Sequence, residues 1–139
     1  MSQLLILLNC WDFQQKPDLY VTTRKQTAQP LESRGPTYCI GECNRRKPVR
    51  SLLVLLKTLS LALRKRPDVI ITTGSMPLAL FCGWSKLLGA KIVWIDSITN
   101  IEKLSVSGRF VRHFADLMLV QWPELTNRYT KAEYVGAIV

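Results

Sequence analysis

The sequence has few of the side chains that commonly bind metals. Among its 139 residues it contains one histidine, His113, and four cysteines. Cys39 and Cys43 are separated by three residues, but no second pair follows at the spacing of a zinc site. We therefore expect no metal site and interpret the cysteines as free thiols of a reducing compartment, with a Cys39–Cys43 redox pair as the alternative.

The sequence also lacks a long uncharged apolar segment. No stretch reaches the roughly 18 residues that a membrane-spanning helix needs. Residues 4–8 are apolar, but no basic segment precedes them and no small-residue cleavage site follows, so we expect no secretory signal. No internal repeat is visible, and a hydrophobic content of 47% is enough to form the core of a single domain spanning residues 1–139.

Acidic residues are scarce. Ten Asp and Glu stand against nineteen Lys and Arg, which gives a formal net charge of +9. Such an excess predicts an anionic partner, whether nucleic acid, anionic lipid head groups or a phosphorylated substrate. The segment from Asn44 to Arg66 has no acid at all. It contains eight basic residues, which are Arg45, Arg46, Lys47, Arg50, Lys57, Arg64, Lys65 and Arg66.

Leucines lie between these cations and predict a helix from Val49 to Leu63, which Pro67 ends. Such a helix can lie on an anionic bilayer, with its apolar side in the lipid and its cations toward the head groups. A crossover helix packed on a sheet is the alternative, and both interpretations can hold together. The side chains expected to contact the membrane are Arg50, Leu53, Leu56, Lys57 and Arg64.

Nucleic-acid binding fits this basic segment poorly. Its cations are interleaved with leucines rather than with aromatic side chains on which bases stack. The sequence shows no helix-turn-helix and no RNA-recognition signature. We therefore expect an anionic membrane surface as partner, and no nucleic acid.

Short, β-branched, apolar segments predict buried parallel strands. Three such strands are predicted, at 18–23, 68–73 and 90–95, with a fourth strand at 117–120 and a short fifth through 133–135. The predicted helices between them are 49–63, 77–88, 110–114 and 123–129. This alternation predicts an α/β fold, with a Rossmann-like parallel sheet and helices on both faces. Residues 26–47 fit neither pattern and predict a long functional loop.

The start of the chain departs from this fold. A doubly wound domain normally opens with a strand and a glycine-rich turn, whereas Met1 to Leu8 predict a helix. In the common strand order the first strand lies in the middle of the sheet, so its absence is expected to leave a gap. We therefore expect either an unusual topology or a chain that is truncated at its N-terminus.

Polar residues follow one predicted strand and begin a helix. They are Thr72, Thr73, Gly74 and Ser75. Backbone N–H groups at such a helix start can bind a pyrophosphate, although an ordinary strand-to-helix turn is the more common reason for this pattern.

The next strand ends at a carboxylate and a hydroxyl, Asp96 and Ser97. Ligands of open parallel sheets bind at this end of the strands, so Asp96 could orient a sugar hydroxyl or act as a base. A capping or turn role for Asp96 is the simpler interpretation. Arg109 could bind a phosphate, or it could be ordinary surface charge.

Six segments together resemble a known family. They are Lys65 to Ser75, Lys86 to Val93, Asp96-Ser97, Ser107 to Arg109, Ala115 to Leu125 and Tyr134 to Gly136. The run Val-Gln-Trp-Pro-Glu-Leu at 120–125, with the upstream Thr-Thr-Gly, is their most specific part. They resemble the Alg14-like oligosaccharide biosynthesis proteins, whose bacterial members include the PssD-type exopolysaccharide proteins, over essentially the whole chain.

This resemblance implies a division of labour between two chains. Proteins of this family are similar to the N-terminal half of MurG-like GT-B glycosyltransferases, and a separate small subunit holds most of the nucleotide-sugar site. The present chain would supply membrane attachment and the acceptor side. The acceptor would be a polyprenyl-diphosphate saccharide, the donor a UDP-sugar, and no metal or organic cofactor would take part. The pair would associate at the cytoplasmic face of the plasma membrane, or of the endoplasmic reticulum membrane in a eukaryote.

The mechanism that the resemblance implies is inverting transfer, in which an acceptor hydroxyl attacks the anomeric carbon as UDP leaves. Thr73, Gly74 and Ser75 would donate from their backbone, Asp96 would lie near the acceptor hydroxyl, and Arg109 would contact an anion. Family members usually carry Glu at the position of Asp96, often Arg at that of Asn100, and an opening strand with a Gly-Gly-His loop. The alternative is a non-catalytic scaffold that only recruits its partner, against which the apolar segment 134–139 could pack.

Overall fold

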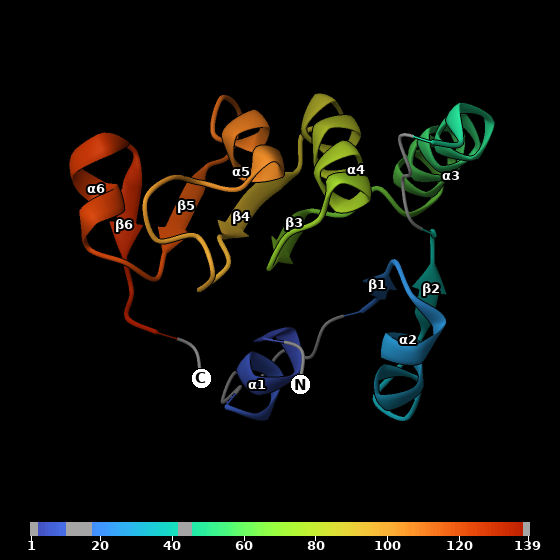
Figure 1. Cartoon of the computed structure of the whole chain (residues 1–139). Coiled ribbons are helices and arrows are strands. Elements are labelled where there is room, and N and C mark those ends of the chain that lie inside the picture. Colours follow the sequence, from blue (N-terminus) through green and yellow to red (C-terminus); the bar gives the residue numbers. More distant parts are fainter. Residues whose placement is uncertain (1–2, 11–17, 42–45, 138–139) are drawn as a thin grey trace.

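The structure is a computed structural model that describes residues 3–10, 18–41 and 46–137 (Figure 1). Strands and helices alternate along the described chain, which confirms the predicted α/β class. The helices are α1 (Gln3–Asn9), α2 (Lys25–Glu32), α3 (Pro48–Lys65), α4 (Met76–Leu87), α5 (Val106–Val111) and α6 (Glu124–Arg128). The strands are β1 (Tyr20–Thr22), β2 (Thr37–Cys39), β3 (Val69–Thr72), β4 (Lys91–Ile95), β5 (Leu117–Val120) and β6 (Ala132–Tyr134).

These strands form two parallel sheets. One contains β1 and β2, and the other has the order β3-β4-β5-β6. β1 and β3 are not paired, so an interruption separates the sheets at the place where the doubly wound order puts a first strand. The predicted gap in the sheet is therefore present. Leu19, Val21 and Ile70 pack against one apolar cluster, so side chains hold the two sheets together there.

Helices cover both sides of the strands, as predicted. Figure 1 shows α3, α4, α5 and α6 in a row on one side, with α1 and α2 on the other. α4 packs against both α3 and α5, so it lies between them in the row. On the opposite side, Leu8, Tyr20 and Leu31 form a small cluster that joins α1 and α2 to β1.

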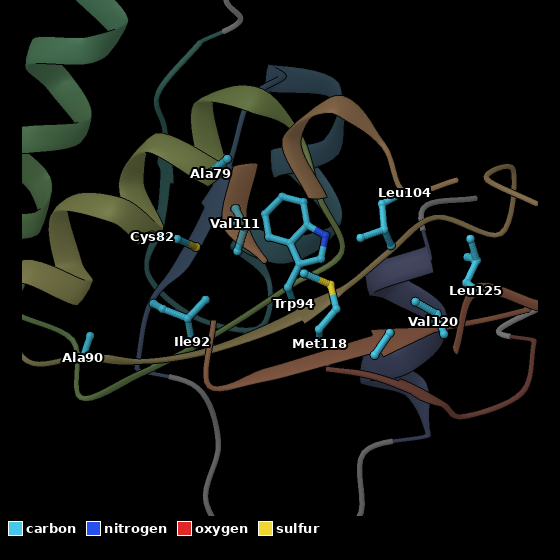
Figure 2. Packing of buried hydrophobic residues seen from close by; sticks show 11 residues of the cluster. Ala79, Cys82, Ala90, Ile92, Trp94, Leu104, Val111, Met118, Val120 and Leu125 are labelled. Atoms are coloured by element: carbon cyan, nitrogen blue, oxygen red, sulfur yellow. The ribbon is translucent and has the colours of Figure 1, made fainter. Parts of the chain in front are cut away.

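The main core lies between the larger sheet and the helices that follow its strands (Figure 2). Ile92 and Trp94 of β4 are completely buried there, because alternate residues of a strand face the same side. Figure 2 shows the Trp94 indole among Val111, Leu104 and Met118. Each large apolar side chain buried in this way contributes about 1.5–3 kcal/mol. This core fixes the carboxyl ends of β3, β4 and β5 relative to one another.

Two predictions of local structure are wrong. The segment 26–47, expected to be a long loop, contains most of α2 and all of β2. The prediction missed them because α2 contains Pro30 and β2 is only three residues long, so neither shows a clear periodicity in the sequence. The short helix expected at 110–114 is α5, which begins earlier. Ser105 caps it by accepting a hydrogen bond from the Gly108 N–H at 2.9 Å. Arg45 and Cys43, on which two predictions rest, lie outside the described residues.

Candidate functional site

The predicted polar residues meet at one edge of the larger sheet. Thr72 pairs with Trp94 across the parallel strands β3 and β4. The residues that follow each strand, Thr73 to Ser75 and Asp96-Ser97, therefore emerge side by side at the carboxyl edge. This is the edge at which open parallel sheets bind their ligands.

The turn between β3 and α4 has an unusual backbone. Gly74 has φ of +113°, and a Cβ at this position would lie 3.4 Å from the Trp94 ring. Ser75, the N-cap of α4, has φ of +142°, which favours glycine and costs a serine about 1–3 kcal/mol. Its Oγ is buried and has no hydrogen-bond partner among the residues that the structure describes. The Gly74 N–H, predicted to donate to an anion, already donates to Thr72 Oγ1 at 3.3 Å. The start of α4 lies at the sheet edge, where the first N–H groups of a helix can bind an anion.

Asp96 is buried and fully hydrogen-bonded by the protein. The residue is only 1% exposed to solvent. Oδ1 accepts from Ser105 Oγ at 2.6 Å and from Trp94 Nε1 at 3.3 Å. Oδ2 accepts from the Ser105 N–H at 3.0 Å and from Asn100 Nδ2 at 3.2 Å. Because both oxygens already accept two hydrogen bonds, a substrate hydroxyl would have to displace a protein donor to reach Asp96.

Gly108 allows α5 to approach this carboxylate. A Cβ at Gly108 would lie 2.7 Å from Asp96 Oδ1 and 2.9 Å from Ser105 Oγ, closer than side-chain atoms pack. A glycine is therefore required at position 108, because any larger side chain would collide with the Asp96 carboxylate. The first turn of α5, with Arg109 next to Gly108, is consequently held close to the end of β4.

The segment between β4 and α5, residues 97–104, is called the β4–α5 loop below. Gln121 Nε2 donates to the Asp96 carbonyl at 2.9 Å, and Trp122 Nε1 donates to the Ile98 carbonyl at 2.6 Å. Sequence reasoning found Gln121 and Trp122 only as part of a resemblance and missed this role. A signal was present, since a polar residue directly after the buried strand β5 faces the same sheet edge.

Two other predicted residues are more accessible. Ser97 is half-buried, and its Oγ is 3.0 Å from Thr99 Oγ1. Arg109 is exposed on α5, and its backbone N–H donates to the Ser105 carbonyl at 2.8 Å. Ser97 is thus the first residue of the β4–α5 loop, and Arg109 lies on the helix that follows the loop.

A second feature lies on α3, away from this edge. Val54, Thr58, Leu61 and Ala62 form its buried side. All five side chains predicted to contact a membrane are on exposed residues. The exposed apolar residues recur at intervals of three and four, so they share one face. They are Val49 (73% exposed), Leu52 (55%), Leu53 (53%), Leu56 (53%) and Leu63 (48%).

Cations line one flank of this face. Arg50, Lys57 and Arg64 follow one another at intervals of seven residues, close to two helical turns. They therefore lie nearly in a row along α3. Among the described residues, no helix is long and apolar enough to cross a membrane. The leucine face of α3, defined as Val49, Leu52, Leu53, Leu56 and Leu63, is an apolar strip bordered by positive charge.

The described part of the chain contains three free cysteines, Cys10, Cys39 and Cys82. No group of three His, Cys, Asp or Glu residues there could hold a metal ion. Cys82 is free and lies in the main core, where burial raises the pKa of its thiol to about 12. A thiol with such a pKa stays protonated and unreactive.

Comparison with known proteins gives one family. Residues 37–138 match the family described as oligosaccharide biosynthesis protein Alg14 like. The mouse protein named UDP-N-acetylglucosamine transferase subunit ALG14 is 39% identical over 85 residues, which cover 57% of this chain and 39% of the mouse protein. The Schizosaccharomyces pombe subunit of the same name is 40% identical over 77 residues, covering 52% of this chain and 37% of the yeast protein.

The Yarrowia lipolytica subunit of that name aligns over a longer stretch. It is 27% identical over 106 residues, which cover 72% of this chain and 49% of the relative. The chain therefore spans less than half the length of these curated relatives. No solved structure matches the fold at a significant level.

Proposed function

Because the chain belongs to the family of Alg14-like oligosaccharide biosynthesis proteins, we propose that it is the acceptor-binding and membrane-recruiting subunit of a two-component UDP-sugar glycosyltransferase. Its relatives are named as subunits of a UDP-N-acetylglucosamine transferase, which supports N-acetylglucosamine as the transferred sugar. The partner would be a small subunit that binds the nucleotide sugar. The acceptor would be a polyprenyl-diphosphate saccharide.

The observation that carries the membrane part of this proposal is the leucine face of α3. Monomeric soluble proteins seldom expose a row of large apolar side chains beside a row of cations. Inserted into a bilayer surface, each leucine gains part of the 1.5–3 kcal/mol of full burial, and each cation gains about 1 kcal/mol from anionic lipids. Together these terms exceed the binding energy of a single lipid chain and support peripheral attachment. We place the subunit at the cytoplasmic face of the plasma membrane, or of the endoplasmic reticulum membrane in a eukaryote.

The carboxyl edge of β3 and β4 is the proposed acceptor side. The backbone N–H groups of Thr73 and Ser75 can bind an acceptor diphosphate, the Gly74 N–H can do so by leaving Thr72 Oγ1, and Arg109 can add charge. The partner would bring the UDP-sugar to the same edge. Sugar transfer then proceeds by attack of the acceptor hydroxyl on the anomeric carbon, with the departing diphosphate stabilised by donors and cations.

A non-catalytic scaffold is the second candidate, and one observation favours it. Asp96, the carboxylate predicted to act on the acceptor, already accepts four hydrogen bonds from the protein. Under this alternative the chain only recruits its partner to the membrane. Tyr134 and Val135, exposed near the end of the described chain, are suited to pack against that partner.

Acceptor binding by this chain alone separates the two candidates. The chain would be titrated with a short-chain polyprenyl-diphosphate N-acetylglucosamine in detergent, and with the matching monophosphate as control. The acceptor-binding proposal expects saturable binding that prefers the diphosphate and weakens in Arg109→Gln. Binding that is found only when the partner subunit is present would support the scaffold instead.

A further inference from the structure

The β4–α5 loop is closed at its base by a buried carboxylate. Asp96 precedes the loop and Ser105 follows it. Both the backbone N–H and the hydroxyl of Ser105 donate to Asp96, at 3.0 Å and 2.6 Å. Asn100, within the loop, adds a third donor. The carboxylate thus joins the two ends of the loop and one point inside it.

The neighbouring strand and helix hold the same loop from the other side. Gln121 and Trp122 directly follow β5 and donate to the carbonyls of Asp96 and Ile98. Arg128 of α6 donates to the carbonyl of Glu102 at 3.2 Å. These donors bind backbone atoms, so they fix the path of the loop rather than one side chain.

The surroundings of Asp96 leave little room for a direct role in chemistry. A general base must come within about 2.6–3.2 Å of the proton that it removes. Asp96 is 1% exposed, and Trp94 and Gly108 close the space around Oδ1. The four hydrogen bonds offset the free-energy cost of burying Asp96, because a buried carboxylate is unfavourable unless donors satisfy it.

We infer that Asp96, Gln121 and Trp122 are positioning residues that hold the β4–α5 loop at the carboxyl edge of the sheet and do not touch the substrate. The location of the acceptor beside this loop rests on the proposed function. The fixing of the loop does not, and it can be tested without any activity.

The first test is hydrogen exchange of the purified chain. Trp122→Phe removes the bond to Ile98 while keeping an aromatic ring, and should speed exchange of amides in residues 97–105 about 3- to 10-fold. Trp84→Phe is the matched control, because Trp84 Nε1 is buried without a partner among the described residues. It should leave the loop unchanged. Equal exchange at 97–105 in Trp122→Phe and wild type would overturn the inference for Trp122.

The second test measures sugar transfer by this chain together with its partner subunit. Trp122→Phe, Gln121→Met and Asp96→Asn should each raise the KM for the acceptor by about 3- to 10-fold and leave kcat within about threefold. The loop is then ordered only part of the time, and binding must restore its order. This KM effect distinguishes positioning from a general loss of folded protein, which would lower kcat alone.

One result would overturn the role of Asp96. If Asp96→Asn lowers kcat by about 100-fold or more, with unchanged acceptor KM and unchanged exchange at 97–105, the carboxylate acts on the reaction itself. If the wild-type pair transfers no sugar at all, the proposed function fails. The exchange measurement, repeated on Gln121→Met and Asp96→Asn, would then still decide whether the three side chains hold the loop.

Discussion

The two neighbouring helices α3 and α4 are both rich in apolar residues, yet they meet very different surroundings. α4 lies between α3 and α5 and packs onto β4, so its apolar side chains are buried or half-buried, with the exception of Leu87 (Figure 1). α3 is at the end of the row, and four residues form its buried side. The fold therefore explains the apolar residues of α4 other than Leu87. The leucine face of α3 remains unexplained by the core and points to a surface outside the protein.

The largest effect on stability is expected for a buried residue of α4. Phe81 of α4 is buried between α3 and the smaller sheet. Phe81→Ala should lower the free energy of unfolding by about 3–5 kcal/mol, because it removes apolar contacts and leaves a cavity. Leu52→Ala, on the exposed face of α3, should change it by less than about 0.5 kcal/mol. Urea denaturation measures both, and equal losses would mean that α3 is packed on both sides.

The next effect concerns membrane attachment. Leu56→Glu puts a charge into the leucine face and should weaken binding to vesicles of phosphatidylcholine and phosphatidylserine at least about 10-fold, since a carboxylate resists burial in lipid. The control is Leu87→Glu, because Leu87 is 80% exposed on α4 outside the leucine face. Co-flotation with vesicles measures both variants. Equal weakening by the two would show that the leucine face has no special part in binding.

A smaller effect belongs to the row of cations. Lys57→Gln should weaken binding to anionic vesicles by about fivefold, the equivalent of about 1 kcal/mol, and should leave binding to neutral vesicles unchanged. Lys131→Gln, an exposed lysine far along the chain, serves as control. Raising the salt concentration should abolish the difference between Lys57→Gln and wild type. A loss of similar size on neutral vesicles would contradict an electrostatic role.

The smallest effect concerns the fastening of α4 to the sheet. Lys86 binds Asp116 at 2.8 Å, and this bond, with a second from the Ile92 N–H, lowers the pKa of Asp116 below its ordinary value of 3.8. A lowered pKa stabilises the folded chain above about pH 4, and this contribution is lost as the pH falls through the folded pKa. Because the pair is partly exposed, Asp116→Asn should cost about 0.5 kcal/mol at pH 7.

Urea midpoints at pH 7 and pH 3 check this prediction. The difference between wild type and Asp116→Asn should be larger at pH 7 and shrink at pH 3, because pH 3 lies below the ordinary pKa of 3.8 at which the carboxyl of the unfolded chain gains its proton. Glu133→Gln, an exposed carboxylate of β6, should show no such pattern. A difference that stays the same at both pH values would mean that the charge of Asp116 is not the cause.

The sequence was sufficient to predict the elements with a strong periodicity. The β-branched runs gave β3, β4 and β5, and the rule that ligands bind at strand ends placed Thr73 and Asp96 at one edge. The region 26–47 failed because β2 is three residues long and α2 contains Pro30. Short elements of this kind are decided by tertiary packing, which no local pattern reveals.

The hydrogen-bond partners of Asp96 could not be predicted from the sequence for a different reason. Its donors come from Trp94, Asn100 and Ser105, and its carbonyl is bound by Gln121, which is 25 positions away. The pairing of β4 with β5 brings Gln121 to Asp96, and the path of the chain after β4 brings Asn100 and Ser105 to the carboxylate. A strand-end carboxylate looks the same in sequence whether it faces a substrate or is enclosed by the protein.

Sugar transfer on vesicles is the most direct test of the proposed two-chain transferase. This chain and its partner subunit would be added, singly and together, to anionic vesicles that contain a polyprenyl-diphosphate N-acetylglucosamine acceptor and are supplied with UDP-N-acetylglucosamine. We predict transfer only when both chains are present, and a rate that falls in Leu56→Glu but not in Leu87→Glu. A partner subunit that transfers the sugar at the same rate with and without this chain would contradict the account.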